Sequence, residues 1–248
     1  MAGKDSKRGS PSPAHAGYFP PRLFGASTAG MKAGWKAAKG LFDPRGADEA
    51  LKSVLPFSDL RLAMVLFGAA GLLAFVFSLL TNIEMLYVLQ MEATIYSEIS
   101  SEPLAVPDFL AIVPMAGINF ITYALLLTML NLLSERIAFA IIRATGGKGR
   151  LEEQMLLASV IWLAISMTTA ANLLAPVGFW ILSLAILGIV GLLYLMAYTV
   201  GRAYSIVHGI GFGHAMAINI VLMIIRLTIW FYGSQLVISM LGASLEGV

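Results

Sequence analysis

The sequence contains no cysteine among its 248 residues. A disulfide bond, a thiolate nucleophile and a metal site with cysteine ligands are therefore excluded. Charged residues are also scarce: they make up 12% of the chain, against roughly a quarter of a typical soluble domain. Hydrophobic residues make up 58%. This composition excludes a water-soluble globular protein.

The sequence contains long runs of residues without a charge. The run 155–201 has 47 residues, too many for one membrane span and about right for two of roughly 20 residues each. The runs lack the alternation of polar and apolar residues that a membrane barrel needs, so they favour helices. We therefore predict an all-α fold, a polytopic membrane helix bundle with about five transmembrane helices at 62–80, 109–133, 155–174, 179–201 and 215–241.

The segments that flank this 60–241 transmembrane domain have a different composition. Residues 1–30 are rich in Gly, Pro and Ser with scattered basic residues, which predicts a disordered basic tail. Residues 31–59 predict short amphipathic helices at the membrane interface, the first with Trp35 among Lys32, Lys36 and Lys39. Residues 242–248 are expected to form a C-terminal tail. The first apolar run begins near residue 62, beyond the usual window of a signal peptide, so we expect it to remain as a helix.

Two glycine-containing segments are expected to end helices. Gly146 and Gly147 follow a helix that we expect to extend from the second span past Glu135, with its end in water. The segment TGGKGR at 145–150 resembles a phosphate-binding loop, but Ile142 and Gly149 stand where that loop needs Gly and Ser or Thr. We interpret it as a tight turn. A hairpin is expected near Pro176 and Gly178.

Lysine and arginine alternate between the predicted loops. Residues 1–61 hold ten, and the four following loops hold none, four, none and one. Because these residues collect in cytoplasmic loops, the pattern predicts a cytoplasmic N-terminus and a C-terminus outside or in a lumen. The membrane would be the cell membrane of a prokaryote, or the ER or Golgi of a eukaryote. Candidate contacts to a partner or to anionic lipid headgroups are Trp35, Lys36, Lys39, Arg143, Lys148 and Arg150.

Arg226 lies near the middle of the fifth predicted span, where an unpaired charge costs at least about 2.5–3.5 kcal/mol. The predicted spans contain no acidic residue, so we expect neutral partners for Arg226. Its role is then either to fix helix packing or to bind a ligand, lipid or ion. The candidate neutral partners are Asn119, Asn172, Asn219, Thr168 and Thr169.

Several motifs contain residue types that are common in ligand sites. His208 and His214 are six residues apart, whereas a ligand pair on one helical face is three or four apart, so a loop near the membrane surface is favoured over a metal site. The acidic residues between 84 and 108 fit a solvated face better than a cation site. No aromatic-interleaved basic motif indicates nucleic acid. We expect no catalytic residue, no cofactor and no metal.

Three stretches resemble the Yip-domain family of five-pass membrane proteins. They are LFDPRGADEAL at 41–51, IIRATGGKGRLEEQMLLASVIW at 141–162, and YSIVHGIGFGHAMAI at 204–218, together with Ala175 and Pro176 where the third span ends. The resemblance implies five helices and no known catalytic residue. In eukaryotes such proteins interact with Rab GTPases.

Three functional hypotheses remain from the sequence. The first is a non-enzymatic scaffold, accessory subunit or trafficking factor that contacts other integral membrane proteins or itself. The second is a small transporter or channel that uses Arg226. The third is a lipid-modifying enzyme whose site would combine Arg143, Lys148, Glu152, Glu153 and His208.

Overall fold

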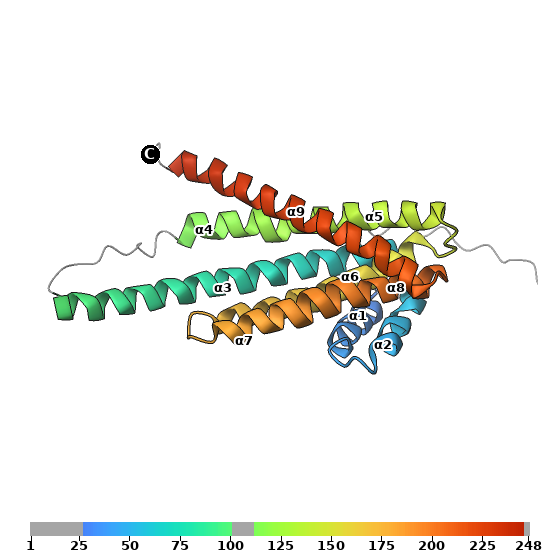
Figure 1. Ribbon diagram of the computed structural model, residues 1–248, viewed down its shortest axis with the longest axis horizontal. Helices are drawn as coiled ribbons and strands as arrows, with labels where there is room; N and C mark the ends of the chain where they lie inside the picture. Colours follow the sequence, from blue (N-terminus) through green and yellow to red (C-terminus); the bar gives the residue numbers. More distant parts are fainter. Residues whose placement is uncertain (1–26, 101–111, 246–248) are drawn as a thin grey trace, which may run out of the picture.

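The computed structural model describes residues 27–100 and 112–245, and in these residues it contains helices and turns but no strand (Figure 1). Five helices in this part of the chain are long and apolar enough to cross a membrane, which confirms the predicted all-α class and number of spans. The protein is therefore an integral membrane protein. The five spans are Leu60–Ser100, Val113–Ala144, Leu151–Leu174, Trp180–His208 and Phe212–Ser239.

Three of the spans combine α-helix with a tighter or wider helical segment. The first span is α3 (Leu60–Ser100) and the fifth is α9 (Phe212–Leu245). The second joins α4 (Ile112–Asn119), the π-helical η3 (Phe120–Leu127) and α5 (Thr128–Ala144). The third joins α6 (Leu151–Thr168) to the 3₁₀-helical η4 (Thr169–Leu174). The fourth joins α7 (Trp180–Ala185), the π-helical η5 (Ile186–Thr199) and α8 (Val200–His208).

Several helices extend beyond the predicted span limits. Helix α3 continues beyond the predicted span limit of residue 80 to Ser100, the last described residue before 112, because no Gly or Pro lies between residues 80 and 100. A charge marks where a helix meets water but does not end it. Helix α9 extends to Leu245, so the predicted tail at 242–248 is partly helical. Helix α1 (Thr28–Gly40) likewise begins inside the predicted disordered tail. Residues 1–26 of that tail, and the predicted start of the second span at 109, lie outside the described residues.

The turns follow the glycine signals. Helix α5 ends at Ala144, followed by Gly146 in the left-handed region with φ 99°. Gly178, with φ 93°, lies in the hairpin between η4 and α7. Both helix ends confirm the predicted turns.

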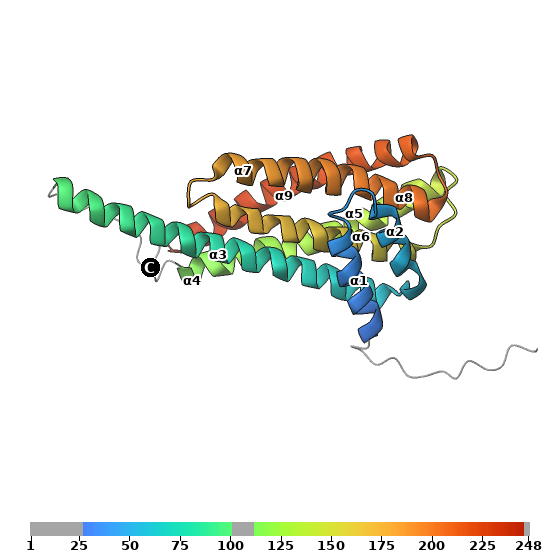
Figure 2. The same cartoon turned by 90° about the horizontal axis from the view of Figure 1, so that it is seen from below.

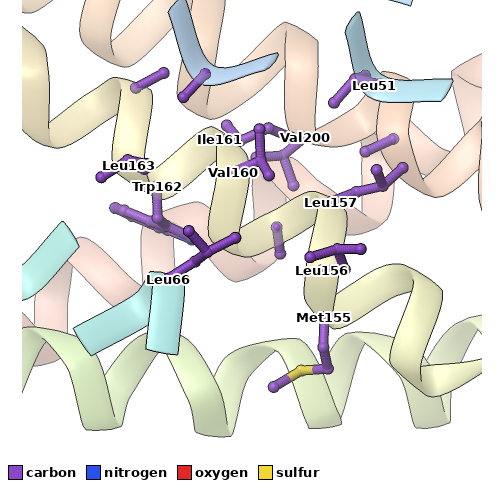
Figure 3. Close-up of a cluster of buried hydrophobic side chains, with 14 of the residues drawn as sticks. Leu51, Leu66, Met155, Leu156, Leu157, Val160, Ile161, Trp162, Leu163 and Val200 are labelled. Atoms are coloured by element: carbon purple, nitrogen blue, oxygen red, sulfur yellow. The ribbon is translucent and has the colours of Figure 1, made fainter. Parts of the chain in front are cut away.

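Helix α6 lies at the centre of the bundle. Its side chains are buried almost all round, from Gln154 to Ala164. Figure 3 shows Trp162 beside Leu66 of α3, with Leu51 and Val200 packed on other sides of the same helix. A helix that is apolar on every side needs such a central position, because each face finds a protein neighbour.

The two N-terminal helices pack against one end of the bundle (Figure 2). Helix α1 buries a face of small residues, among them Gly30 and Gly34, whose Cα atoms approach Leu62 and Leu66 of α3 closely. Helix α2 (Ala47–Val54) buries Leu51 and is followed by η1 (Leu55–Phe57). The predicted helices of the 31–59 segment are thus present, and they are docked on the bundle.

Two long-range contacts hold this N-terminal segment in place. Asp48 of α2 accepts two hydrogen bonds from Arg202 of α8, at 2.6 and 3.1 Å. The Tyr194 hydroxyl donates to the Leu41 carbonyl at 2.9 Å. Arg202 was the one basic residue of the last predicted loop. Its bidentate pair with Asp48 gives it a structural role, because the pair joins α2 to the fourth span.

Basic residues gather at the end of the bundle that carries α1, α2, α8 and the α5–α6 turn. The C-terminal end of α9 lies at the opposite end (Figure 1). We name this region the basic end and define it by its exposed Lys and Arg side chains. The exposed acidic residues on the same segments are Asp43, Glu49 and Asp59. The ten exposed basic residues are Lys32, Lys36, Lys39, Arg45, Lys52, Arg61, Arg136, Arg143, Lys148 and Arg150.

Candidate functional site

Arg226 of α9 is buried between α5 and α8, with 2% of its surface exposed. Its Nη2 atom donates to the Glu135 carboxylate at 2.7 Å and to the Tyr204 hydroxyl at 3.3 Å. Its Nε atom donates to the Ser134 hydroxyl. The guanidinium also lies over the Trp162 ring, 5.7 Å from its centroid. Arg226 therefore has an ion-pair partner inside the bundle.

The prediction that Arg226 has only neutral partners is wrong. Glu135 has no exposed surface, although we expected it on a helix end in water. The error came from treating the first charged residue after the second apolar run as the membrane boundary. A charge that is neutralised inside the protein does not have to mark that boundary.

Glu135 is the centre of a hydrogen-bond network that joins four of the five spans. The Tyr204 hydroxyl donates to its carboxylate at 2.8 Å, and Gln154 Nε2 donates to the same carboxylate at 3.0 Å. Gln154 Nε2 also donates to the Glu135 carbonyl at 2.9 Å. The network thus includes α5, α6, α8 and α9. Because an unpaired carboxylate in a bundle core is costly, these donors make the position of Glu135 tolerable.

His208 completes the network at the basic end. Its Nε2 atom lies 2.8 Å from Gln154 Oε1. The Gln154 amide nitrogen donates to Glu135, which leaves the amide oxygen, an acceptor only, facing His208. His208 Nε2 is therefore the donor. His208 is 2% exposed, so the prediction of a surface-loop histidine is wrong for this residue. His214 is exposed.

The spacing of the network residues along α5 and α8 puts them on one face of each helix. In α5, buried Asn131, Glu135, Ala138 and Ile142 recur at intervals of three or four residues. In α8, Val200, Tyr204 and His208 recur at intervals of four. This spacing is visible in the sequence, but the partner faced by each stripe is not.

A cavity of about 300 Å³ lies beside Arg226. The three non-α-helical segments of the described spans all contribute to its wall: η3 with Tyr123, η4 with Thr169 and η5 with Gly191. Departures of this kind within membrane helices are frequent at functional sites. Further lining residues are Leu127, Asn131, Trp162, Ile165, Thr168, Leu187, Leu192, Met196, Arg226, Leu227 and Trp230.

Several polar atoms of the lining residues are buried without a hydrogen-bond partner in the described part of the chain. They are Arg226 Nη1, Trp162 Nε1, Trp230 Nε1 and Asn131 Oδ1. Such atoms are few in folded proteins, since each costs roughly 1–3 kcal/mol. Four of the nine such atoms found in the described residues belong to residues that line this one cavity.

The other predicted partners of Arg226 have different roles. The Asn219 amide donates to the carbonyls of Met196 and Ala197, at 2.9 and 2.8 Å, and so joins α9 to η5. Asn119 is buried in α4 and Asn172 is half-buried in η4. Thr168 and Thr169 line the cavity, and neither donates to nor accepts from Arg226.

The α5–α6 turn forms a second, polar groove with the end of α8. Lys148, Arg150, Glu153 and His208 line this groove of about 490 Å³. Gly149 approaches the backbone of Val207 so closely that a Cβ atom there would meet the Val207 carbonyl. Arg143 donates to the Gly147 carbonyl at 3.2 Å and lies over Phe139. The groove is therefore held by a fixed turn.

The N-terminal candidates lie together on α1. Trp35, Lys36 and Lys39 are exposed, and the Lys39 ammonium lies 5.9 Å from the centre of the Trp35 ring. A shallow groove between α1 and α3 includes these three residues and Lys32. An aromatic ring among lysines is typical of a helix at a membrane interface.

Comparisons with family profiles, with curated proteins and with solved structures find no match to this chain. The resemblance to the Yip-domain family therefore stays a prediction.

Proposed function

We propose that this protein is a non-enzymatic membrane scaffold whose basic end docks the acidic surface of a protein partner. The observation that carries the proposal is the charge of that end, with ten exposed Lys or Arg side chains against three exposed acidic ones and three half-buried ones, Asp48, Glu152 and Glu153. Opposite charges across an interface steer the encounter and select the partner. Membership of the Yip-domain family, in which five-pass proteins interact with Rab GTPases, forms part of the proposal.

The basic residues belong to a helix and to a hydrogen-bonded turn. They therefore form a preorganised surface and do not lie on a flexible loop. Lys36 and Lys39 belong to α1, whose opposite face packs on α3 and α6. Lys148 and Arg150 belong to a turn whose amide at Lys148 donates to the His208 carbonyl. Less conformational entropy is lost when a preorganised surface binds.

A cytoplasmic location of the basic end is part of the proposal and rests on the charge asymmetry. In the far half of α3, Glu92 and Glu98 are exposed, and residues 62–100 contain no Lys or Arg. The positive-inside tendency then puts the basic end in the cytoplasm.

The pairing of Arg226 weighs against the transporter or channel alternative. A translocation site needs ionisable groups that are free to exchange partners, whereas the Arg226 side chain is engaged by Glu135, Ser134 and Tyr204. The lipid-enzyme alternative has little support as well. His208 binds Gln154, and Glu153 accepts from the Arg150 amide in a capping role.

Charge reversal tests the scaffold proposal. The full chain is purified from membranes of its source organism in mild detergent, beside a variant with Lys36→Glu, Lys39→Glu, Lys148→Glu and Arg150→Glu. Glu92→Lys with Glu98→Lys provides a control at the other end of α3. We expect the wild type and the control to retain a co-purifying protein that the variant loses, and that protein to dissociate as salt increases.

Two results contradict the proposal. One is recovery of the same proteins with the charge-reversed variant. The other is a monodisperse wild-type monomer that retains anionic lipid but no protein, which would make the basic end a lipid-binding surface.

A further inference from the structure

The cavity beside Arg226 has the properties of a ligand site and lies within the membrane-spanning part of the bundle. We propose that it binds an uncharged, lipid-soluble molecule through a carbonyl oxygen. This role is separate from docking at the basic end.

The unpartnered atoms indicate what the ligand must offer. Three of the four unpartnered atoms at this cavity, Arg226 Nη1, Trp162 Nε1 and Trp230 Nε1, are nitrogen donors, and only Asn131 Oδ1 is an acceptor. The remaining nitrogens of Arg226 already donate to Ser134, Glu135 and Tyr204. A carbonyl oxygen has two lone pairs and can accept from two of these donors. The ligand is therefore an acceptor, with its oxygen at the guanidinium side of the cavity.

The charge balance of the site favours a neutral acceptor. The positive charge of Arg226 is already matched by Glu135, 2.7 Å away, and no other Lys or Arg lines the cavity. A carboxylate or phosphate would therefore add an uncompensated negative charge inside the bundle, which is expensive in an apolar environment. A carbonyl oxygen accepts the same hydrogen bonds without this cost.

The rest of the cavity is apolar and aromatic. Tyr123 and Trp230 lie with ring centroids 6.0 Å apart, and Ile165, Leu187 and Leu192 supply aliphatic surface. A volume of about 300 Å³ is at the lower end of the range for small-molecule pockets. Leu227, another lining residue, is exposed on the outer surface of the bundle, so the cavity wall reaches the surface that faces hydrocarbon.

Four probes test this assignment on the purified full chain in detergent. Methyl laurate and laurate have the same alkyl chain and differ in charge, dodecane lacks an acceptor, and decylubiquinone has its carbonyls on a ring. We expect methyl laurate or decylubiquinone to raise the Tm saturably, since a ligand that binds the folded state stabilises it. Laurate and dodecane should have little effect. The two uncharged carbonyl probes also show whether the natural carbonyl belongs to a chain ester or to a ring.

Three variants link any binding to the cavity. Trp230→Phe removes one donor and keeps an aromatic ring, and should weaken binding roughly five- to tenfold. Ile165→Trp should abolish binding by filling the space. Trp180→Phe changes an exposed tryptophan outside the cavity and should leave the affinity unchanged.

Three outcomes would overturn the proposal. The first is no saturable rise in Tm with either carbonyl probe, as expected if only water satisfies the donors. The second is an equal or larger rise with laurate or dodecane. The third is binding that both cavity variants leave intact. Failure of the charge-reversal test at the basic end would leave these results unaffected.

Discussion

Glu135 and Arg226 are 91 residues apart in the sequence, and their side chains meet at 2.7 Å with almost no exposed surface. The pair neutralises the charge that makes the fifth span unusual. Gln154, Tyr204 and Ser134 satisfy further hydrogen-bonding groups of the two side chains. The second and fifth spans are thus joined by a contact that is strong only when both partners are present.

Removal of one partner of this pair should be much more harmful than removal of both. We expect Glu135→Leu or Arg226→Leu to lower the free energy of unfolding by about 3–5 kcal/mol, because each leaves a buried unpaired charge. The double variant should be less destabilised than either single variant, because it leaves no buried charge unpaired. Thermal or denaturant unfolding of the four proteins in one detergent measures this coupling. Strictly additive effects would show that the two charges do not interact.

Gln154 is expected to contribute through its hydrogen bonds. Gln154→Met has a similar volume but deletes the bonds to Glu135 and His208, and should cost about 1–3 kcal/mol. Gln235→Met, at an exposed position of α9, is the matched control and should change stability by less than about 0.5 kcal/mol. Equal unfolding temperatures for the two variants would argue against a structural role of the network.

Gly149 tests the close contact between the α5–α6 turn and α8. Gly149→Ala should be destabilising, because its Cβ would meet the backbone of Val207, which cannot move aside like a side-chain end. Gly117→Ala, in the interior of α4 where a Cβ meets nothing within 4 Å, should instead stabilise by roughly 0.5–1 kcal/mol. Opposite shifts in Tm are therefore expected. An unchanged Tm for Gly149→Ala would indicate that the turn lies farther from Val207 than the structure shows.

The Asp48–Arg202 contact should make the docking of α2 sensitive to acid. Hydrogen bonds from Arg202 lower the pKa of the Asp48 carboxyl below its ordinary value of 3.8. A lowered pKa means that the stabilisation is present above pH 4 and is lost as pH falls through the folded-state pKa. Both side chains are about one-third exposed, so the contribution is at most about 1 kcal/mol.

A comparison of variants isolates this contribution. The stability difference between wild type and Asp48→Asn should be present at pH 7 and shrink below pH 4. Glu49→Gln, at an exposed position of the same helix, is the control for a general change in charge. A difference that stays constant from pH 7 to pH 3 would contradict the ion pair.

The absence of cysteine makes the orientation directly testable. Single Lys148→Cys and Glu98→Cys variants can be treated with a membrane-impermeant maleimide in intact cells. We expect labelling of residue 98 without permeabilisation, and labelling of residue 148 only after it, because the basic end is predicted to be cytoplasmic. The reverse pattern would invert the orientation.

The sequence by itself determined the class, the number of spans and the helix stops. Uncharged runs and glycines act locally, because a backbone in hydrocarbon must satisfy its own hydrogen bonds within a helix. The helix limits were less predictable, as α3 shows by continuing twenty residues beyond its predicted span limit at residue 80. Helix continuation depends on backbone conformation, whereas the predicted limits followed polarity.

The tertiary structure alone decided which polar residues meet. Glu135 looked like a helix end in water, and His208 like part of a surface loop, yet both are buried in one network with Gln154. Their spacing on α5 and α8 indicated a buried face, but not the neighbour across it. The burial of a charge depends on the partner that neutralises it, and for Glu135 that partner comes from a helix that begins 77 residues later, at Phe212.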